Sequence, residues 1–410
     1  MKRFFTLLCC FLILFSIAGC NKAKDLSLQS GANIPTLPQN PTDSSTDPTA
    51  PSEPKPPVLD GPVSQVPTVS ITMPKKTESY TASDGSILLE YVYPNMDLEQ
   101  MLIMQDPMVS ENIKIDLMNR IEDTYATRDS LLSQAKTAYN GSTSWVPYQY
   151  TVEYDPQRID SGVLSFVASE VTFDGFRPDK KFKFVNYSMT TGQALSLYNI
   201  ILEKNMTSQV CALAVKSLES QQDTLFSDYK YTVEEHFDGE INDNWCFSPN
   251  GLSFYFEPGD IAPNAVGMVA AEIPYSKLAG ILRDEFFPAE RAMTTGKLQM
   301  NQFNIDNLDV YTNFSELILD EKAPKVLLFT DKAAYDIKIE IGTRTENGVY
   351  RKDYGIFAQS SLTPGDAIMV SANLNNGTCL HIQYQIGHNT AHAYLILDTE
   401  TNRIKLIEQA

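Results

Sequence analysis

The sequence is poor in the residues on which most catalytic and metal chemistry depends. It has four histidines and six cysteines in 410 residues, and it contains no Gly-rich phosphate loop and no G-x-S-x-G nucleophile motif. Basic residues are also scarce: 32 lysines and arginines stand against 51 acidic residues, a formal net charge of −19. Because these motifs are missing, we expect no enzymatic activity and no cofactor. We also expect no nucleic-acid binding, because so acidic a surface repels polyanions.

The four histidines show no metal-ligating pattern. His388 and His392 are superficially similar to a metal motif, but the run that follows them is strand-like. Residues four apart on a strand are about 13 Å apart, too far to share one ion, and these two could meet only if a loop bends there. An alternating apolar pattern puts His381 on a strand, where we expect a surface position, and His236 has no useful neighbour in the sequence. No metal ligand is predicted.

The N-terminus has the features of an export signal. Lys2 and Arg3 precede an apolar run from Phe4 to Ala18, and small residues follow it. Ile-Ala-Gly-Cys at this point resembles a bacterial lipobox, which implies a signal peptide over 1–19 and a diacylglycerol and palmitate modification of Cys20. An ordinary secretory signal or an uncleaved anchor are the alternatives. The run is short of the about 20 apolar residues that a spanning helix needs. We expect a lipid anchor at the extracytoplasmic face of the bacterial cell membrane.

Residues 20–78 are rich in Pro, Ser and Thr and almost devoid of aromatics. Such a composition cannot bury enough apolar surface to fold, so we expect a disordered, extended tether. Only Cys211, Cys246 and Cys379 remain beyond it. At most one disulfide can form among three cysteines, with Cys211–Cys246 the favoured pair, although burial as a small apolar side chain is the commoner role.

The acidic excess is concentrated in one part of the chain. Residues 79–295 contain 31 acidic and 15 basic residues, a net charge of −16, whereas residues 296–410 contribute −4. Such a surface attracts cationic proteins or peptides and raises their association rates. The alternative is that the charge only keeps an exported protein soluble.

The hydrophobic pattern predicts an α+β fold. A hairpin through Asp84-Gly85, a helix over 112–139 and alternating strands after Trp145 indicate one helix-on-antiparallel-sheet domain, residues 79–190. A second such domain follows at 191–290, and residues 296–410 contain short strands typical of a small all-β, sandwich-like domain. The tyrosines of the strands after Trp145 favour core packing over a sugar-stacking platform.

The most distinctive stretch is GLSFYFEPGDIAPNAVGMVAAEIPYSKL, residues 251–278. We interpret it as a strand, a proline-stiffened crossing and a neighbouring strand, in which proline fixes φ and glycine permits close approach. Most of it is framework. The exposed crossing is the candidate binding loop, made of Glu257, Pro258, Gly259, Asp260, Ile261, Ala262 and Pro263.

Together with the preceding NYSMTTGQALSLYNII and a helix, this stretch resembles the extracytoplasmic domain family of the anti-sigma factor RsiV and the deacetylase PdaC. The matching positions are Leu252, Phe254, Phe256, Pro258, Ile261, Ala262, Pro263, Gly267, Ile273, Pro274 and Tyr275. Gly259 and Asn264 depart from the family, which commonly has tyrosine there. Residues 79–190 look like the PdaC-type companion domain. The zinc-dependent deacetylase module is not found, since VTFDGFRPD has Gly175 in place of a second aspartate.

In RsiV this type of domain binds lysozyme, a cationic protein. The resemblance therefore implies a membrane-anchored lipoprotein whose paired α+β domains bind a cationic protein such as lysozyme, or a cell-wall glycan. Two alternatives remain open. One is an accessory or degenerate relative of a peptidoglycan-modifying enzyme, and the other is an envelope scaffold or sensor partner.

Overall fold

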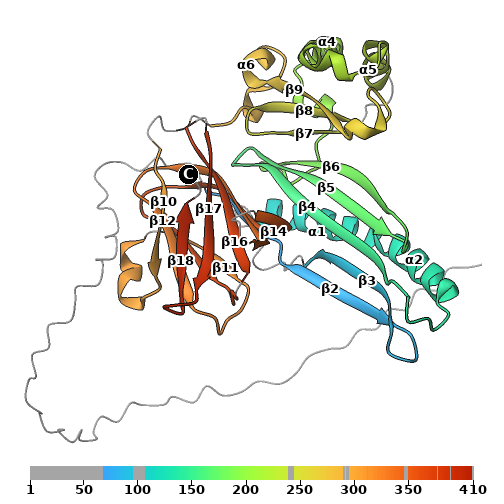
Figure 1. Ribbon diagram of the computed structural model, residues 1–410. Coiled ribbons are helices and arrows are strands. Elements are labelled where there is room, and N and C mark those ends of the chain that lie inside the picture. The colour runs from blue at the N-terminus through green and yellow to red at the C-terminus, as the bar shows by residue number, and fades with distance from the viewer. Residues whose placement is uncertain are drawn as a thin grey trace, which may run out of the picture. The chain divides into compact units, whose positions relative to one another are not determined.

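The computed structural model describes residues 68–95, 107–238, 244–289, 291, 295–311, 313–345, 350–375, 377–387 and 389–408. All of them belong to one unit of the chain, Glu53–Ala410. The predicted signal peptide, the lipidation site Cys20 and the tether up to residue 67 lie outside the described residues. The fold class is α+β, with helices and mostly antiparallel sheets followed by a smaller all-β part (Figure 1).

The first part is a five-stranded sheet of order β2-β3-β4-β5-β6 with two helices. Its elements are β2 (Lys75–Thr81), β3 (Ile87–Pro94), α1 (Pro107–Asp123), α2 (Tyr125–Ala138), β4 (Tyr148–Ile159), β5 (Val163–Phe173) and β6 (Pro178–Ser188). β3 and β4 pair in parallel, against the predicted antiparallel sheet. The helices lie between them in sequence, and a crossover of this kind returns the chain in the same direction.

The single helix predicted over 112–139 is two helices. They meet at Thr124, whose hydroxyl donates to the Ile121 carbonyl at 2.6 Å. The Tyr91 hydroxyl lies 2.6 Å from the same Thr124 oxygen, so the junction is tied to β3. A hydroxyl that bonds to a carbonyl three or four residues back competes with the helical pattern. The break therefore coincides with a threonine that is bonded both to the end of α1 and to β3.

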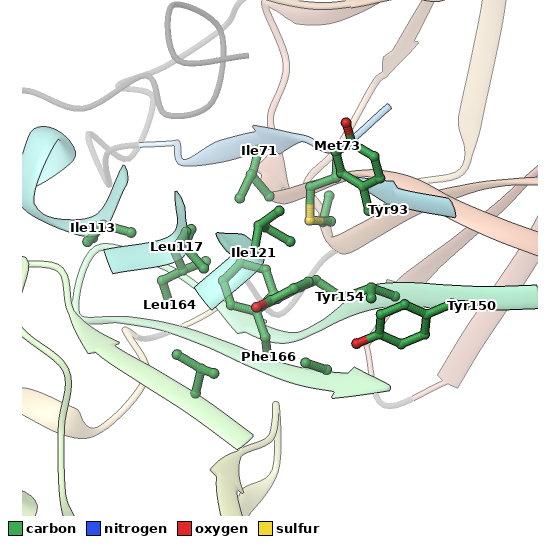
Figure 2. Close-up of a cluster of buried hydrophobic side chains, with 14 of the residues drawn as sticks. Ile71, Met73, Tyr93, Ile113, Leu117, Ile121, Tyr150, Tyr154, Leu164 and Phe166 are labelled. Atoms are coloured by element: carbon green, nitrogen blue, oxygen red, sulfur yellow. The ribbon is translucent and has the colours of Figure 1, made fainter. Parts of the chain in front are cut away.

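The core of this part lies between α1 and the sheet. Ile113, Leu117 and Ile121 of α1 recur at helical spacing and gather beside Leu164 and Phe166 of β5 (Figure 2). The tyrosines after Trp145 belong to the same core: Tyr148, Tyr150 and Tyr154 are buried at 8%, 0% and 4% exposure. Of the two interpretations of this aromatic strand, core packing is therefore confirmed.

The second part is a three-stranded antiparallel sheet, β7-β8-β9, with helices packed on it. Its elements are α3 (Leu197–Ile200), η1 (Lys204–Met206), α4 (Thr207–Leu218), η2 (Glu219–Thr224), α5 (Tyr229–Asp238), β7 (Trp245–Phe247), β8 (Gly251–Phe256), η3 (Asn264–Val266), β9 (Val269–Pro274), α6 (Tyr275–Leu278) and η4 (Asp284–Phe286). The Asn186 amide of β6 donates to the Trp245 carbonyl at 3.0 Å. This buried bond ties the second part to the first.

The third part has two sheets around a shared core. Its elements are β1 (Ser70–Thr72), β10 (Leu298–Gln302), η5 (Ile305–Val310), β11 (Asn313–Ile318), β12 (Lys325–Thr330), β13 (Ala334–Arg344), β14 (Tyr350–Leu362), β15 (Asp366–Ser371), β16 (Thr378–Ile386), β17 (Asn389–Asp398) and β18 (Arg403–Glu408). The sheets have the orders β1-β14-β13-β16-β17-β18 and β10-β12-β15-β11. Side chains from both sheets form one cluster, as in a sandwich. Tyr354 of β14 donates to the Val152 carbonyl of β4 at 3.0 Å.

Strand β1 was not predicted, because residues 20–78 were assigned to the tether. It pairs antiparallel with β14, with Ile71 opposite Ala358. Val69, Ile71 and Met73 are buried at 4%, 0% and 1% exposure. Their alternation is the period-two pattern of a strand, masked by the proline-rich sequence around it. The last residues of the predicted tether are thus part of the fold.

Candidate functional site

The candidate site is built on α5 and the crossing between β8 and β9. Helix α4 buries Val210, Ala214 and Leu218, which recur every four residues on one face. Helix α5 buries Tyr229 and Val233 in the same core. Both helices therefore pack their apolar faces into the core and present their polar faces to solvent.

The residues of the predicted binding loop, which form the crossing, fall into two groups by their burial. Ile261 and Ala262 are core residues at 0% and 1% exposure, so their side chains are not available to a ligand. Glu257, Pro258, Gly259 and Pro263 are exposed, and Asp260 is half-buried. Gly259 adopts φ +98°, and a Cβ at this position would lie 2.6 Å from Asn264 Oδ1. The positive φ favours glycine there, whereas the close atom is the end of a flexible side chain that can move aside.

The crossing is hydrogen-bonded to the segment before α5 and lies beside α5 itself. The Phe226 amide donates to the Ile261 carbonyl at 2.9 Å. The Glu257 amide donates to Asp260 Oδ2 at 2.9 Å. His236 of α5 lies with Nε2 3.9 Å from the same Asp260 oxygen, and its ring meets Phe256 edge-on at 5.4 Å. The loop and the helix therefore present one continuous surface.

This surface is strongly acidic. Residues 198–276 contain twelve acidic and three basic residues. We define the acidic surface as the solvent-facing carboxylates of η2, α5, the turn between them and the crossing: Glu219, Asp223, Asp228, Glu234, Glu235, Glu257 and Asp260. Lys230 lies among them, with Nζ 3.6 Å from Glu219 Oε1. Like charges gathered on one face produce a potential that concentrates cations there.

Two aromatic side chains stand within the acidic surface. Phe226 is 38% exposed and Tyr231 is 63% exposed. A hydrogen bond to Glu235, one helical turn away, raises the pKa of Tyr231. Aromatic faces surrounded by carboxylates suit lysine and arginine side chains, which pair with the anions and stack on the rings. The arrangement can therefore bind a basic peptide or protein surface.

A second cluster lies on the six-stranded sheet, where the sequence predicted none. His381 was expected at the surface, and this prediction is wrong: it is 6% exposed. Its Nδ1 is 3.0 Å from Glu340 Oε2, and its Nε2 is 2.9 Å from His392 Nδ1. Glu340 lies opposite His381 in the register of β13 and β16. Sequence spacing cannot show such pairing, because these residues come from three strands.

The electrostatics of this cluster follow from its burial and its lysine. Burial alone would raise the pKa of Glu340, but the hydrogen bond from His381 and the charge of Lys352 lower it to about 2. Burial and the neighbouring His381 lower the pKa of His392. A carboxylate only accepts, so His381 donates from Nδ1. When both rings are neutral, His381 accepts at Nε2 and His392 keeps its lone pair on its own Nε2.

Within the described ranges, no three or more His, Cys, Asp or Glu side chains are arranged to hold a metal ion. His388, considered with His392 from the sequence, lies outside the described residues. None of the helices in the described part of the chain is both long and apolar enough to cross a bilayer. Cys211, Cys246 and Cys379 are buried and form no disulfide, so the favoured Cys211–Cys246 pair is absent.

The comparison with known proteins gives a family match for one stretch of the chain. The family model "Protein of unknown function (DUF3298)" matches residues 198–276. This part of the chain is thus a DUF3298 domain, and it contains α4, α5 and the crossing. The chain as a whole matches no curated protein.

Two solved structures of DUF3298 family proteins are similar to this chain. One comes from Pseudomonas aeruginosa PAO1, at 14% identity, covering 55% of this chain and 99% of that chain with a TM-score of 0.37. The other comes from Bacteroides fragilis NCTC 9343, at 15% identity, covering 54% of this chain and 95% of that chain with a TM-score of 0.35.

Proposed function

We propose that this chain is an extracytoplasmic, lipid-anchored binding module that captures a cationic protein at the acidic surface, and that it has no catalytic role. The observation that carries the proposal is the gathering of exposed carboxylates around Phe226 and Tyr231 on one domain. The resemblance to the lysozyme-binding domain of RsiV supports the same partner chemistry. Anchoring through Cys20 would keep the module at the membrane.

Long-range attraction between opposite charges explains why such a surface would serve capture. Carboxylates spread over a helix and a loop attract a basic protein before contact and raise its association rate. Exposed aromatics then add contact area that charge alone does not supply. Attraction of this kind is screened by salt, with a Debye length of about 10 Å at 0.1 M and about 3 Å at 1 M.

The test is a titration of the full chain, solubilised in a nonionic detergent, with hen egg-white lysozyme at low and high salt. We expect binding at low salt that weakens steeply as salt is added. Succinylated lysozyme, which has the same fold and reversed charge, should not bind. Absence of binding to unmodified lysozyme at low salt would remove the proposal.

A pair of matched variants locates the site. Glu234→Lys with Glu235→Lys reverses two charges on α5 and should abolish most of the low-salt binding. Glu316→Lys with Glu400→Lys makes the same change in net charge at exposed positions of the third part. If both double variants weaken binding equally, net charge alone is responsible and the acidic surface is not the site.

A further inference from the structure

The turn between β5 and β6 exposes a phenylalanine to an unusual degree. Phe176 is 90% exposed, compared with 75% for Met108 and 63% for Tyr231. The turn is well defined: Asp174 Oδ1 accepts from the amides of Phe176 and Arg177 at 3.1 and 3.3 Å. Gly175 supplies the positive φ of +88°. The aromatic ring is therefore held at the tip by a built turn, although large apolar side chains usually find cover.

A second apolar side chain stands beside this turn. Val146 is 49% exposed. A Cβ on Gly175 would lie 3.8 Å from the Val146 carbonyl oxygen and 3.6 Å from the Tyr148 ring. The segment before β4 and the hairpin turn are thus in contact. Val146 and Phe176 therefore expose apolar side chains on two segments that touch one another.

Exposed basic side chains surround this tip. Arg177, Lys180, Lys181 and Lys183 are all exposed. With Asp174 and Asp179 as the acidic residues, residues 174–183 carry a net charge of +2, within a stretch, 79–295, whose net charge is −16. Four of the fifteen basic residues of that stretch lie in these ten positions. Positive charge is therefore concentrated where the chain is otherwise acidic.

The strand register places the positive charges on both faces of the hairpin. Lys181 and Lys183 alternate with Lys180 along β6, so they point to opposite faces. Lys183 pairs with Glu170 at 2.6 Å, and the Lys180 ammonium lies 4.7 Å from the centre of the Phe182 ring. A tip with charge on both faces suits an approach end-on to a flat anionic surface.

We propose that the β5–β6 hairpin docks on an anionic phospholipid bilayer. Phe176 and Val146 enter the headgroup region, while Arg177, Lys180 and Lys181 contact lipid phosphates. Aromatic side chains favour this interface, and basic residues near an anionic leaflet gain electrostatic attraction. A soluble polyanion would use the lysines but would give the exposed apolar tip no cover. The bilayer accounts for both features, and this proposal does not depend on the acidic surface.

The test places a reporter at the tip of the full chain. Phe176→Trp is mixed with vesicles containing brominated phosphatidylcholine, either alone or with roughly a third phosphatidylglycerol. Tyr231→Trp, on the acidic surface, is the matched control, and the wild-type protein gives the background of its two tryptophans. We expect quenching of Phe176→Trp about threefold or more above that of the control in the anionic vesicles, since an interfacial ring lies about 5–10 Å deep.

The charge requirement is tested separately. Lys180→Glu with Lys181→Glu should remove the quenching of Phe176→Trp, whereas Lys216→Glu with Lys277→Glu, at exposed positions elsewhere, should leave it intact. Equal quenching of the two tryptophan variants, or no dependence on phosphatidylglycerol, would overturn the proposal. A response of Phe176→Trp to soluble polyphosphate but not to vesicles would also overturn it, because the ligand would then be a polyanion in solution.

Discussion

Arg158 donates from Nη1 to the hydroxyl oxygen of Tyr275 at 2.6 Å. Arg158 is 2% exposed and belongs to β4, whereas Tyr275 ends the Ile-Pro-Tyr sequence after β9. The same Arg158 nitrogen donates to the Phe286 carbonyl at 2.6 Å, and its Nε pairs with Asp160 at 2.6 Å. The Tyr275 hydroxyl in turn donates to the Ser248 carbonyl at 3.0 Å. The tyrosine of the motif is thus part of a joint between the first and second parts of the fold.

Tyr275→Phe tests this joint. The variant removes the oxygen that accepts from Arg158 and leaves a buried charged donor with one partner fewer. Loss of a buried hydrogen-bond partner costs about 1–3 kcal/mol, so the free energy of unfolding in urea should fall by that amount. Tyr231→Phe, at an exposed tyrosine, should change it by less than about 0.5 kcal/mol. Equal stability of both variants and the wild type would show that the joint carries no net stabilisation.

The histidine cluster predicts that acid destabilises the fold. The pKa of His392 is lower in the folded chain than its usual value of 6.5. Below pH 6.5 the unfolded chain therefore binds more protons than the folded chain. Stability falls as the pH drops through that value. Glu340 has its pKa lowered to about 2 from 4.5, which adds a further loss as the pH falls from 4.5 toward 2. The difference between pKa values of 4.5 and about 2 corresponds to about 3 kcal/mol.

The measurement is the urea midpoint as a function of pH. The wild-type curve should decline below about pH 6.5, and His392→Gln should flatten the part between neutrality and mild acid while leaving the steeper loss at lower pH. Glu340→Gln should reduce that steeper loss. A wild-type midpoint that rises on acidification from neutral pH would contradict the assigned direction.

The buried cysteines predict slow thiol chemistry. Burial raises the pKa of Cys246 to about 12, although the Tyr255 hydroxyl opposes this shift. Cys211 and Cys379 are also buried. Because the thiolate is the reactive form, iodoacetamide should not modify these three residues in the folded protein. Peptide mapping after unfolding without reductant should find all three alkylated. If Cys211 and Cys246 stayed unmodified until a reductant was added, a disulfide would link them.

Ile71→Ala tests how much β1 contributes to the stability of the fold. Ile71 is fully buried, and truncating such a side chain to alanine costs about 2–5 kcal/mol. The free energy of unfolding should fall accordingly. Val266→Ala, at a position 46% exposed, is the matched truncation and should have little effect. Similar stability for the two variants would mean that β1 adds nothing to the fold.

The sequence predicted those features that arise from local periodicity. The spacing of Leu117 and its neighbours predicted a helix, and the Asp84-Gly85 pair predicted the first hairpin. The crossing around Gly259 lies between two paired strands, as expected. The sequence did not predict the break at Thr124, since that depends on a hydroxyl partner supplied by Tyr91. Helix propensity and apolar spacing carry no information about such a tertiary bond.

The candidate sites were predictable only in part. The charge of residues 79–295 indicated a surface for cations, and the crossing was singled out by its prolines, but the contribution of α5 became visible only when its His236 was found 3.9 Å from Asp260. The histidine cluster was missed because Glu340 and His381 are neighbours through strand register. Register is set by the pairing of whole strands and cannot be inferred from one strand at a time.

The position of β1 has a mechanical consequence. Residues 1–67 join the described fold at this strand, whose bonds to β14 run between segments nearly three hundred positions apart, such as Ser70 and Gln359. Val69, Ile71 and Met73 of the same segment pack in the core of the first part, so a pull on the N-terminal end of the chain would load β14 and that core together. Shear along β1 and β14 would decide whether the rest of the molecule keeps its shape under tension.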